Sequence, residues 1–303
     1  MRNVILVLLG FITMACTSKK EIEKPKVAVV ISTLNNPWFV VLAESAVANA
    51  NRLGYEAKIF DSQNNPANES NHFENLIASG YDAILFNPTD ADGSISNILK
   101  AKKAGVPVFC MDREVNSNEA ATSQILSDNY SGCIAIGVEF VKTIGEKGKY
   151  VEILGLAGDN NTYARSNGFH TVVDQFPGLE MIAQQNGDFD RNKAMEVMET
   201  ILQANDSIDA VFCGNDSMAL GVYQALKSAG KSEQIKVFGF DGNDEVVEKI
   251  KAGEIVATGM QYPKVMAKTA AEYADQYFQG KRNFPQHVPV AVDLVTMETS
   301  KNF

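Results

Sequence analysis

The stretch KVAVVISTLNNPWF, residues 26–39, joins an apolar run to a polar turn that ends in two large aromatic residues. The run KVAVVI is typical of a strand covered on both faces, because it lacks the strict apolar–polar alternation of a half-exposed strand. Trp38 and Phe39 do not continue this apolar pattern. They follow a polar turn, where a loop or a helix start would face solvent, so we expect them to serve something other than the core.

Similar runs recur along the chain and alternate with helical patterns, for example at 92–104, 130–146, 191–204, 216–229 and 263–279. Short β-rich runs separated by helices predict parallel sheets covered on both faces. Two βαβαβ halves fit a chain of 303 residues, so the sequence predicts an α/β fold with two domains. The strand candidates are KVAVVI (26–31), EAKIF (56–60), AILF (83–86), VPVFC (106–110), YVEIL (150–154), MIAQQ (181–185), AVFC (210–213), IKVFGF (235–240) and ATGM (257–260).

Polar or aromatic side chains follow seven of these strands. Ligands of open parallel sheets bind outside the carboxyl ends of the strands. Asn and Asp are also common turn and N-cap residues, which explains any one of them equally well. A pattern shared by seven strand ends favours a ligand site instead. Its candidate residues are Asn36, Trp38, Phe39, Asn87, Asp112, Arg113, Arg165, Asn215, Asp241 and Gln261.

The candidate set lacks the usual parts of a catalyst. None of the three histidines follows a strand, and no GxSxG, HExxH or GxGxxG motif occurs in the sequence. We therefore expect neither an enzyme nor a cofactor or metal site. The alternative that stays open is a carboxylate pair formed by Asp112 and Asp241.

The same set suits the recognition of a polyol. Each sugar hydroxyl donates and accepts hydrogen bonds: carboxylates accept them, guanidinium groups donate them in planar forks, and carboxamides do both. Aromatic faces cover the C–H faces of a sugar ring and add apolar contact. The segment NNPWF, residues 35–39, therefore predicts an aromatic floor beside an amide.

Charge and the N-terminal segment restrict the partners. Acidic residues outnumber basic ones by 37 to 27, for a net charge of −10, which argues against a nucleic-acid partner. Arg2 precedes an apolar stretch too short to span a bilayer, which ends at Ala15 and Cys16. It resembles a bacterial lipoprotein signal over 1–15, with lipidation at Cys16 and a polar tether over 16–25. An ordinary secretory signal with a chance cysteine is the alternative.

The remaining cysteines predict no disulfide framework. Cys110 and Cys213 each end an apolar run, which indicates buried thiols. With Cys133 they make three, which cannot pair completely, and no CxxC spacing suggests metal binding or redox chemistry.

Nine motifs, in this order, resemble the ribose binders, the pentose-binding branch of the type I periplasmic binding proteins. The resemblance runs from about residue 26 to the end of the chain. The motifs are VVISTLNNPWF, FDSQNNPA, LFNPTDAD, MDREV, LSDN, DFDR, CGNDSMALG, KSAGKS and VFGFDG.

The resemblance implies two Rossmann-like doubly wound domains that close over one sugar. It places the three hinge segments near Ser127–Asp128, Gln261–Tyr262 and Pro289. The N-terminal sugar-binding domain then comprises 26–127 plus 262–289, and the C-terminal one comprises 128–261 plus 290–303.

The resemblance also adds Phe189 to the residues that contact the sugar. The polar positions keep the identities of the ribose binders, whereas Trp38 replaces a phenylalanine. We therefore expect D-ribose as the ligand, with fructose, allose or another small pyranose as alternatives. The first-domain residues are Asn36, Trp38, Phe39, Asn87, Asp112 and Arg113, the second-domain residues are Arg165, Phe189, Asn215 and Asp241, and Gln261 lies in the hinge.

The implied function is that of a lipid-anchored, monomeric solute-binding protein that delivers a sugar to an ABC permease, without a cofactor. The alternative from another class is a sensory protein that presents the bound sugar to a membrane receptor. A repressor effector domain shares the fold, but it would need an N-terminal helix-turn-helix, where this chain has a signal-like segment.

Overall fold

Two six-stranded sheets form the framework of the molecule, which a computed structural model describes for residues 24–303. The predicted signal segment, Cys16 and nearly all of the tether lie outside the described residues. The first sheet is entirely parallel, in the order β11-β5-β4-β3-β1-β2. Its strands are β1 (Lys26–Ile31), β2 (Glu56–Asp61), β3 (Ala83–Phe86), β4 (Val108–Met111), β5 (Ser123–Ser127) and β11 (His287–Val290).

The second sheet has the order β12-β10-β9-β8-β6-β7. Only its edge strand β12 runs antiparallel to its neighbour. All nine predicted strands are present, whereas β5, β11 and β12 were not predicted. The strands are β6 (Lys147–Leu154), β7 (Gly178–Asn186), β8 (Ala210–Cys213), β9 (Lys236–Phe238), β10 (Ala257–Met260) and β12 (Asp293–Thr296).

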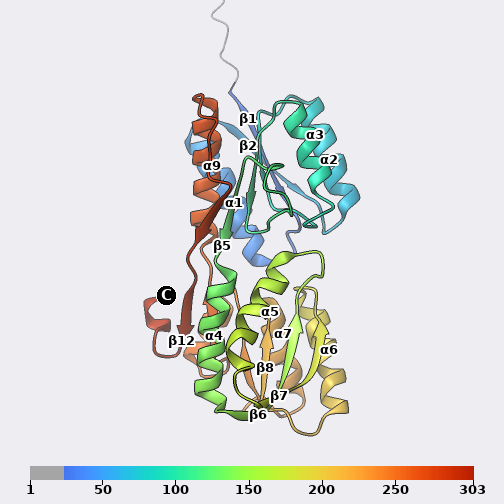
Figure 1. Ribbon diagram of the computed structural model, residues 1–303, viewed down its shortest axis with the longest axis vertical. Coiled ribbons are helices and arrows are strands. Elements are labelled where there is room, and N and C mark those ends of the chain that lie inside the picture. The colour runs from blue at the N-terminus through green and yellow to red at the C-terminus, as the bar shows by residue number, and fades with distance from the viewer. Residues whose placement is uncertain (1–23) are drawn as a thin grey trace, which may run out of the picture.

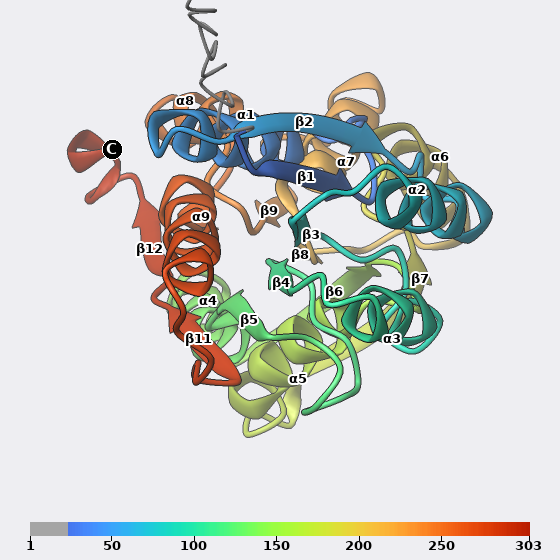
Figure 2. The same cartoon turned by 90° about the horizontal axis from the view of Figure 1, so that it is seen from above.

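Helices cover both faces of each sheet, as Figures 1 and 2 show. Alternate residues of β1 face opposite sides: Val27 and Val29 pack in one apolar cluster, and Ala28 and Val30 in another. This two-sided burial explains why KVAVVI carries no polar alternation. The helices are α1 (Pro37–Arg52), α2 (Pro66–Ala78), α3 (Ile95–Lys103), α4 (Asn129–Ile144), α5 (Asn160–Val173), α6 (Arg191–Ala204), α7 (Asp216–Ser228), α8 (Asp244–Lys251) and α9 (Pro263–Phe278).

The chain passes between the two sheets three times, at Ser127–Asn129, Met260–Pro263 and Val290–Asp293. The first two passages coincide with the predicted hinge segments. The third lies just beyond the predicted Pro289, because Val290 still pairs with Ser127 in the first sheet. The division into the two predicted domains otherwise stays a prediction that the sheet memberships support.

The carboxyl ends of the parallel strands of both sheets point toward the junction between the domains (Figure 1). On one flank of this junction the domains touch. Ala91 N–H donates to Gly158 O at 2.8 Å, and Asn160 Nδ2 donates to Glu114 Oε1 at 2.8 Å. These contacts hold the strand ends of the two domains face to face.

Candidate ligand-binding site between the domains

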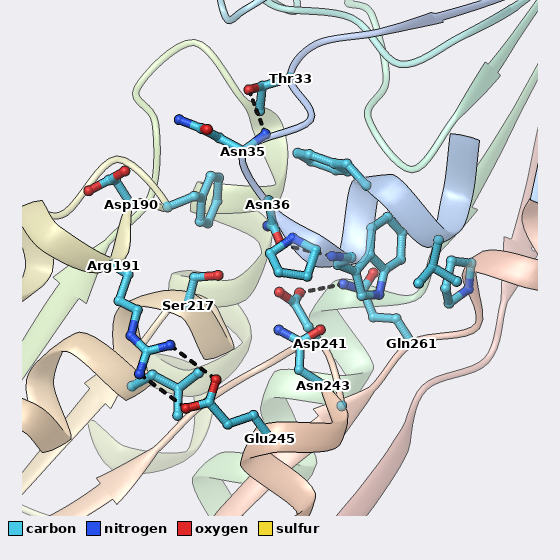
Figure 3. A pocket seen from close by; sticks show the side chains of 18 of the residues that line it. Thr33, Asn35, Asn36, Asp190, Arg191, Ser217, Asp241, Asn243, Glu245 and Gln261 are labelled. Atoms are coloured by element: carbon cyan, nitrogen blue, oxygen red, sulfur yellow. Dashed lines mark hydrogen bonds and ion pairs between the residues drawn. The ribbon is translucent and has the colours of Figure 1, made fainter. Parts of the chain in front are cut away.

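A cavity lies at the junction, and ten of the eleven predicted site residues line it. Asn87 is the exception. A larger cavity of about 740 Å³ adjoins it and is seen in Figure 3. The inner cavity is lined by Asn36, Trp38, Phe39, Asp112, Arg113, Asp159, Asn161, Arg165, Phe189, Asn215, Asp241 and Gln261.

Asp112 and Arg113 directly follow β4 and are each only 2% exposed. Asp112 adopts the left-handed backbone conformation, with φ of 67°, which Asp tolerates better than most residues. Its Oδ1 is buried and has no hydrogen-bond partner among residues 24–303. Arg113 Nε forms an ion pair with Asp159 Oδ2 of the second domain at 2.6 Å. Asp112 thus contributes an unpaired hydrogen-bond acceptor, and Arg113 contributes an ion pair across the junction.

Burial raises the pKa of Asp112 to about 7, although the cations Arg165 and Arg113 act in the opposite direction. The ionised carboxylate is therefore costly in the empty cavity. A hydroxyl that donates to Oδ1 would replace part of the lost hydration.

Asn87 is not among the residues that line the cavity, and its predicted contact with the ligand stays a prediction. Its Oδ1 accepts from Ser32 Oγ at 2.5 Å and Ser32 N at 3.3 Å, and its Nδ2 donates to Met111 O at 3.1 Å and Asp112 Oδ2 at 3.3 Å. Since a carboxamide has two donors and two acceptor sites, this side chain is fully occupied. Asn87 therefore orients Asp112 from behind.

Asp241 and Gln261 form the corresponding buried pair on the second-domain side. Gln261 Nε2 donates to Asp241 Oδ1 at 2.7 Å (Figure 3), and Arg165 Nη1 lies 3.6 Å from the same oxygen. Gln261 Oε1 has no hydrogen-bond partner among the described residues. Burial raises the pKa of Asp241 well above its usual value, although Arg165 lowers it.

Aromatic rings flank these polar groups. Trp38 and Phe39, 4% and 6% exposed, open α1 and meet edge to face at 5.6 Å between ring centroids. They pack in the first-domain core and line the cavity as well, so the expected solvent exposure of this helix start is wrong. Trp38 Nε1 is buried and has no hydrogen-bond partner within residues 24–303.

Phe189 enters the cavity from the loop between β7 and α6. Its φ of 58° is uncommon for a bulky residue. A Cβ added to Gly155 would lie 2.0 Å from Phe189 Cζ, so only glycine admits the ring there. Phe189 lies 5.6 Å from the Arg165 guanidinium and 6.0 Å from that of Arg113.

Two of the predicted asparagines serve the helices and the cavity together. Asn36 Oδ1 accepts from Trp38 N at 3.0 Å as the N-cap of α1, and Asn215 Oδ1 accepts from Met218 N at 2.9 Å as the N-cap of α7. Each cap fixes the carboxamide through its oxygen and leaves Nδ2 as the donor. The turn and N-cap explanation of Asn at strand ends is therefore correct for both, and both still line the cavity.

Asp159 and Asn161 were missed by sequence reasoning. Asp159 caps α5 and pairs with Arg113, while Asn161 Nδ2 donates to Asp112 O at 3.3 Å across the junction. The signal was available, because DNN at 159–161 follows β6 as the other site residues follow their strands. No group of three or more His, Cys, Asp and Glu side chains among residues 24–303 could hold a metal ion.

Two parallel-sheet domains with a polar, aromatic-flanked cavity between them define a two-domain solute-binding protein. The sequence profile of the periplasmic binding protein domain matches residues 27–282. The chain belongs to this family, as a type I periplasmic sugar-binding protein of ABC transporters. The family comprises substrate-binding transport proteins, not enzymes, and it implies export to the periplasm. No helix within residues 24–303 is long and apolar enough to cross a membrane.

Relatives named for the sugars they bind align with most of the chain. It is 40% identical to the D-apiose import binding protein of Paraburkholderia graminis, over 89% of this chain and 86% of the relative. It is 37% identical to the ribose import binding protein RbsB of Escherichia coli, over 94% and 95%. A periplasmic solute-binding protein from Actinobacillus succinogenes, solved with bound D-allose, superposes with a TM-score of 0.86 at 28% identity, covering 92% of this chain and all of that one.

Proposed function

We propose that the protein captures one pentose in the cavity between its domains and delivers it to an ABC importer. One observation carries the proposal: apart from Arg113 Nε and Asp159 Oδ2, which form an ion pair with each other, three buried polar atoms of the lining residues lack a hydrogen-bond partner among residues 24–303. They are Asp112 Oδ1, Gln261 Oε1 and Trp38 Nε1. Buried polar groups nearly always have hydrogen-bond partners. Two unpaired acceptors and one unpaired donor at the same junction therefore favour a ligand that both donates and accepts hydrogen bonds. Sugar hydroxyls do both.

D-ribose is the proposed ligand, because the polar residues keep the identities of the ribose binders. D-apiose is the second candidate, and the 40% identity to an apiose import binding protein favours it. Both are pentoses. Trp38 stands where the ribose binders have phenylalanine, and we propose that it favours a pentose over larger sugars.

Binding is proposed to proceed by domain closure. The lining residues come from both domains, so only the closed arrangement completes the cavity, and a ligand shifts the population toward it. Small-angle scattering with and without saturating pentose tests this step, and closure predicts a smaller radius of gyration with the sugar. An unchanged radius would contradict it.

A lipid anchor at Cys16 is proposed to hold the protein at the membrane. Replacing Cys16 with serine should release the protein from the membrane fraction while calorimetry shows unchanged sugar binding. If the Cys16→Ser protein stays with the membrane although mass spectrometry shows that residues 1–15 have been removed, acylation is excluded as the anchor. Co-purification of the matching permease with the sugar-loaded protein would distinguish import from sensing.

A further inference from the structure

One end of the first domain collects basic side chains, although the whole chain carries a net charge of −10. This end, the basic pole, lies opposite the cavity, where β1 begins and the domain's helices end (Figure 1). Its charges come from the last five residues of each helix, the connections that follow, the two residues before β1, the four residues before β5 and the first three residues of each parallel strand. Nine cations meet five carboxylates: Lys24, Lys26, Arg52, Lys58, Lys100, Lys102, Lys103, Lys281 and Arg282 against Glu56, Glu74, Asp82, Glu119 and Asp275.

Helix dipoles alone do not explain this excess. Cations are favoured at helix C-termini in any domain, and the corresponding end of the second domain has them too. There, however, eight cations meet eight carboxylates. They are Lys142, Lys147, Lys149, Lys227, Lys231, Lys236, Lys249 and Lys251 against Glu146, Asp174, Glu180, Asp206, Asp209, Glu233, Glu248 and Glu254. The positive excess is therefore specific to the pole at which the described chain begins.

The cations of the basic pole are exposed except for the half-buried Lys26, and two of them lie over aromatic rings. Lys102, Tyr277, Arg282 and Phe284 line a groove of about 640 Å³ at this end. The Arg282 guanidinium lies 4.1 Å from the Tyr277 ring centroid, and Lys281 Nζ lies 4.7 Å from that of Phe284. Basic residues with half-buried aromatic rings suit the headgroup region of a bilayer, where both are enriched.

The position of the start of the described chain indicates that the surface in contact with the basic pole is a membrane. Residue 24 directly precedes β1, which begins at the basic pole, and residues 17–25 span at most about 30 Å even when fully extended. A lipid on Cys16 would hold the pole within that distance of the membrane. Each Lys or Arg close to an anionic surface then adds attraction that fades within a Debye length of about 8–10 Å.

We propose that the basic pole rests on the anionic phospholipid surface of the membrane while the protein is not docked on its permease. This goes beyond the proposed sugar-binding function and does not depend on the identity of the sugar. The many carboxylates elsewhere on the molecule are repelled by the same surface, which favours one orientation.

Vesicle co-sedimentation tests the proposal with residues 17–303, which include all described residues, so that neither an acyl group nor the apolar signal segment contributes. The probes are phosphatidylcholine vesicles with and without about one third phosphatidylglycerol, at low and high salt. We expect binding only to the anionic vesicles, with loss at high salt. The triple change Lys102→Gln, Lys103→Gln, Lys281→Gln should weaken it about tenfold or more.

The matched control changes Lys227, Lys231 and Lys251 to glutamine at the balanced end of the second domain, and it should bind as the parent does. Circular dichroism and sugar calorimetry verify that both triple variants are folded. Salt-insensitive binding, absence of binding to anionic vesicles, or equal weakening by both triple changes would overturn the proposal. None of these outcomes bears on the pentose proposal, which calorimetry tests separately.

Discussion

Replacing Asp112 with asparagine should weaken sugar binding and stabilise the empty protein at the same time. Asparagine has nearly the same shape as aspartate and tolerates the φ of 67° at this position, so the backbone need not move. The change removes the charge behind the open acceptor Oδ1. A hydrogen bond to a charged group contributes about 1.5–3 kcal/mol, so we expect affinity for the pentose to fall by about 10- to 150-fold.

The stability effect has the opposite sign. The pKa of Asp112 is raised from 3.8 to about 7 by burial, so the folded state holds this proton more tightly than the unfolded state between those values. The stability of the empty protein should therefore fall as pH rises from about 4 to about 7. A rise of about three pKa units corresponds to at most about 4 kcal/mol, and hydration of an opened cleft reduces it. Asp112→Asn should recover part of this loss at pH 8.

Calorimetry for the sugar and urea unfolding between pH 4 and pH 8 check both effects. Glu44→Gln, an exposed position on α1, is the matched control and should change neither. An Asp112→Asn protein that binds the pentose within threefold of the parent, or that is less stable than the parent at pH 8, would refute this role of Asp112.

Three further changes have defined outcomes. Trp38→Phe removes the unpartnered indole N–H and some volume, so discrimination between pentoses and hexoses should loosen by about 1–3 kcal/mol in calorimetry; an unchanged ratio would exclude Trp38 as a selector. Gly155→Ala should displace Phe189 and weaken binding by about 1–3 kcal/mol, and retained affinity would show that the ring can move aside. Hydrogen bonding to Glu152 raises the pKa of His170 to about 9, so its stabilising contribution is complete below about pH 6.5 and is lost as pH rises through 9. His170→Asn should cost about 1–2 kcal/mol at pH 6 after allowance for solvent screening and nothing at pH 10, as measured by urea unfolding, and an equal cost at both would contradict the pH effect.

The sequence was most informative where strands are central and parallel. Both faces of a run such as KVAVVI pack against apolar clusters, so its continuous apolar pattern identifies it as a central strand. The residues that follow it lie at the junction because the carboxyl ends of the parallel strands meet there. The strands β5, β11 and β12 were not predicted because SQILS, HVPV and DLVT are short and mix polar with apolar residues. Their pairing depends on chain passages between the domains, which no local pattern encodes.

The candidate site, like the fold, could be predicted from the sequence only in part. Asp112 and Gln261 could be predicted as neighbours of strand ends, but their open oxygens depend on side-chain geometry. Asn87 looks identical to them in sequence, and only the contacts with Ser32 and Met111 show that it supports the site from behind. Asp159 resembles a simple N-cap until its contact across the junction is seen.

Titration calorimetry of the unaltered protein with D-ribose, D-apiose, D-allose and D-fructose tests the central claim most directly. We expect one binding site per chain and the tightest binding for a pentose, with D-ribose first and D-apiose second. Tighter binding of fructose or allose than of either pentose would contradict the ligand proposal and leave the family membership standing. No heat with any of the four sugars, from protein shown to be folded and free of bound sugar, would contradict the proposed function itself.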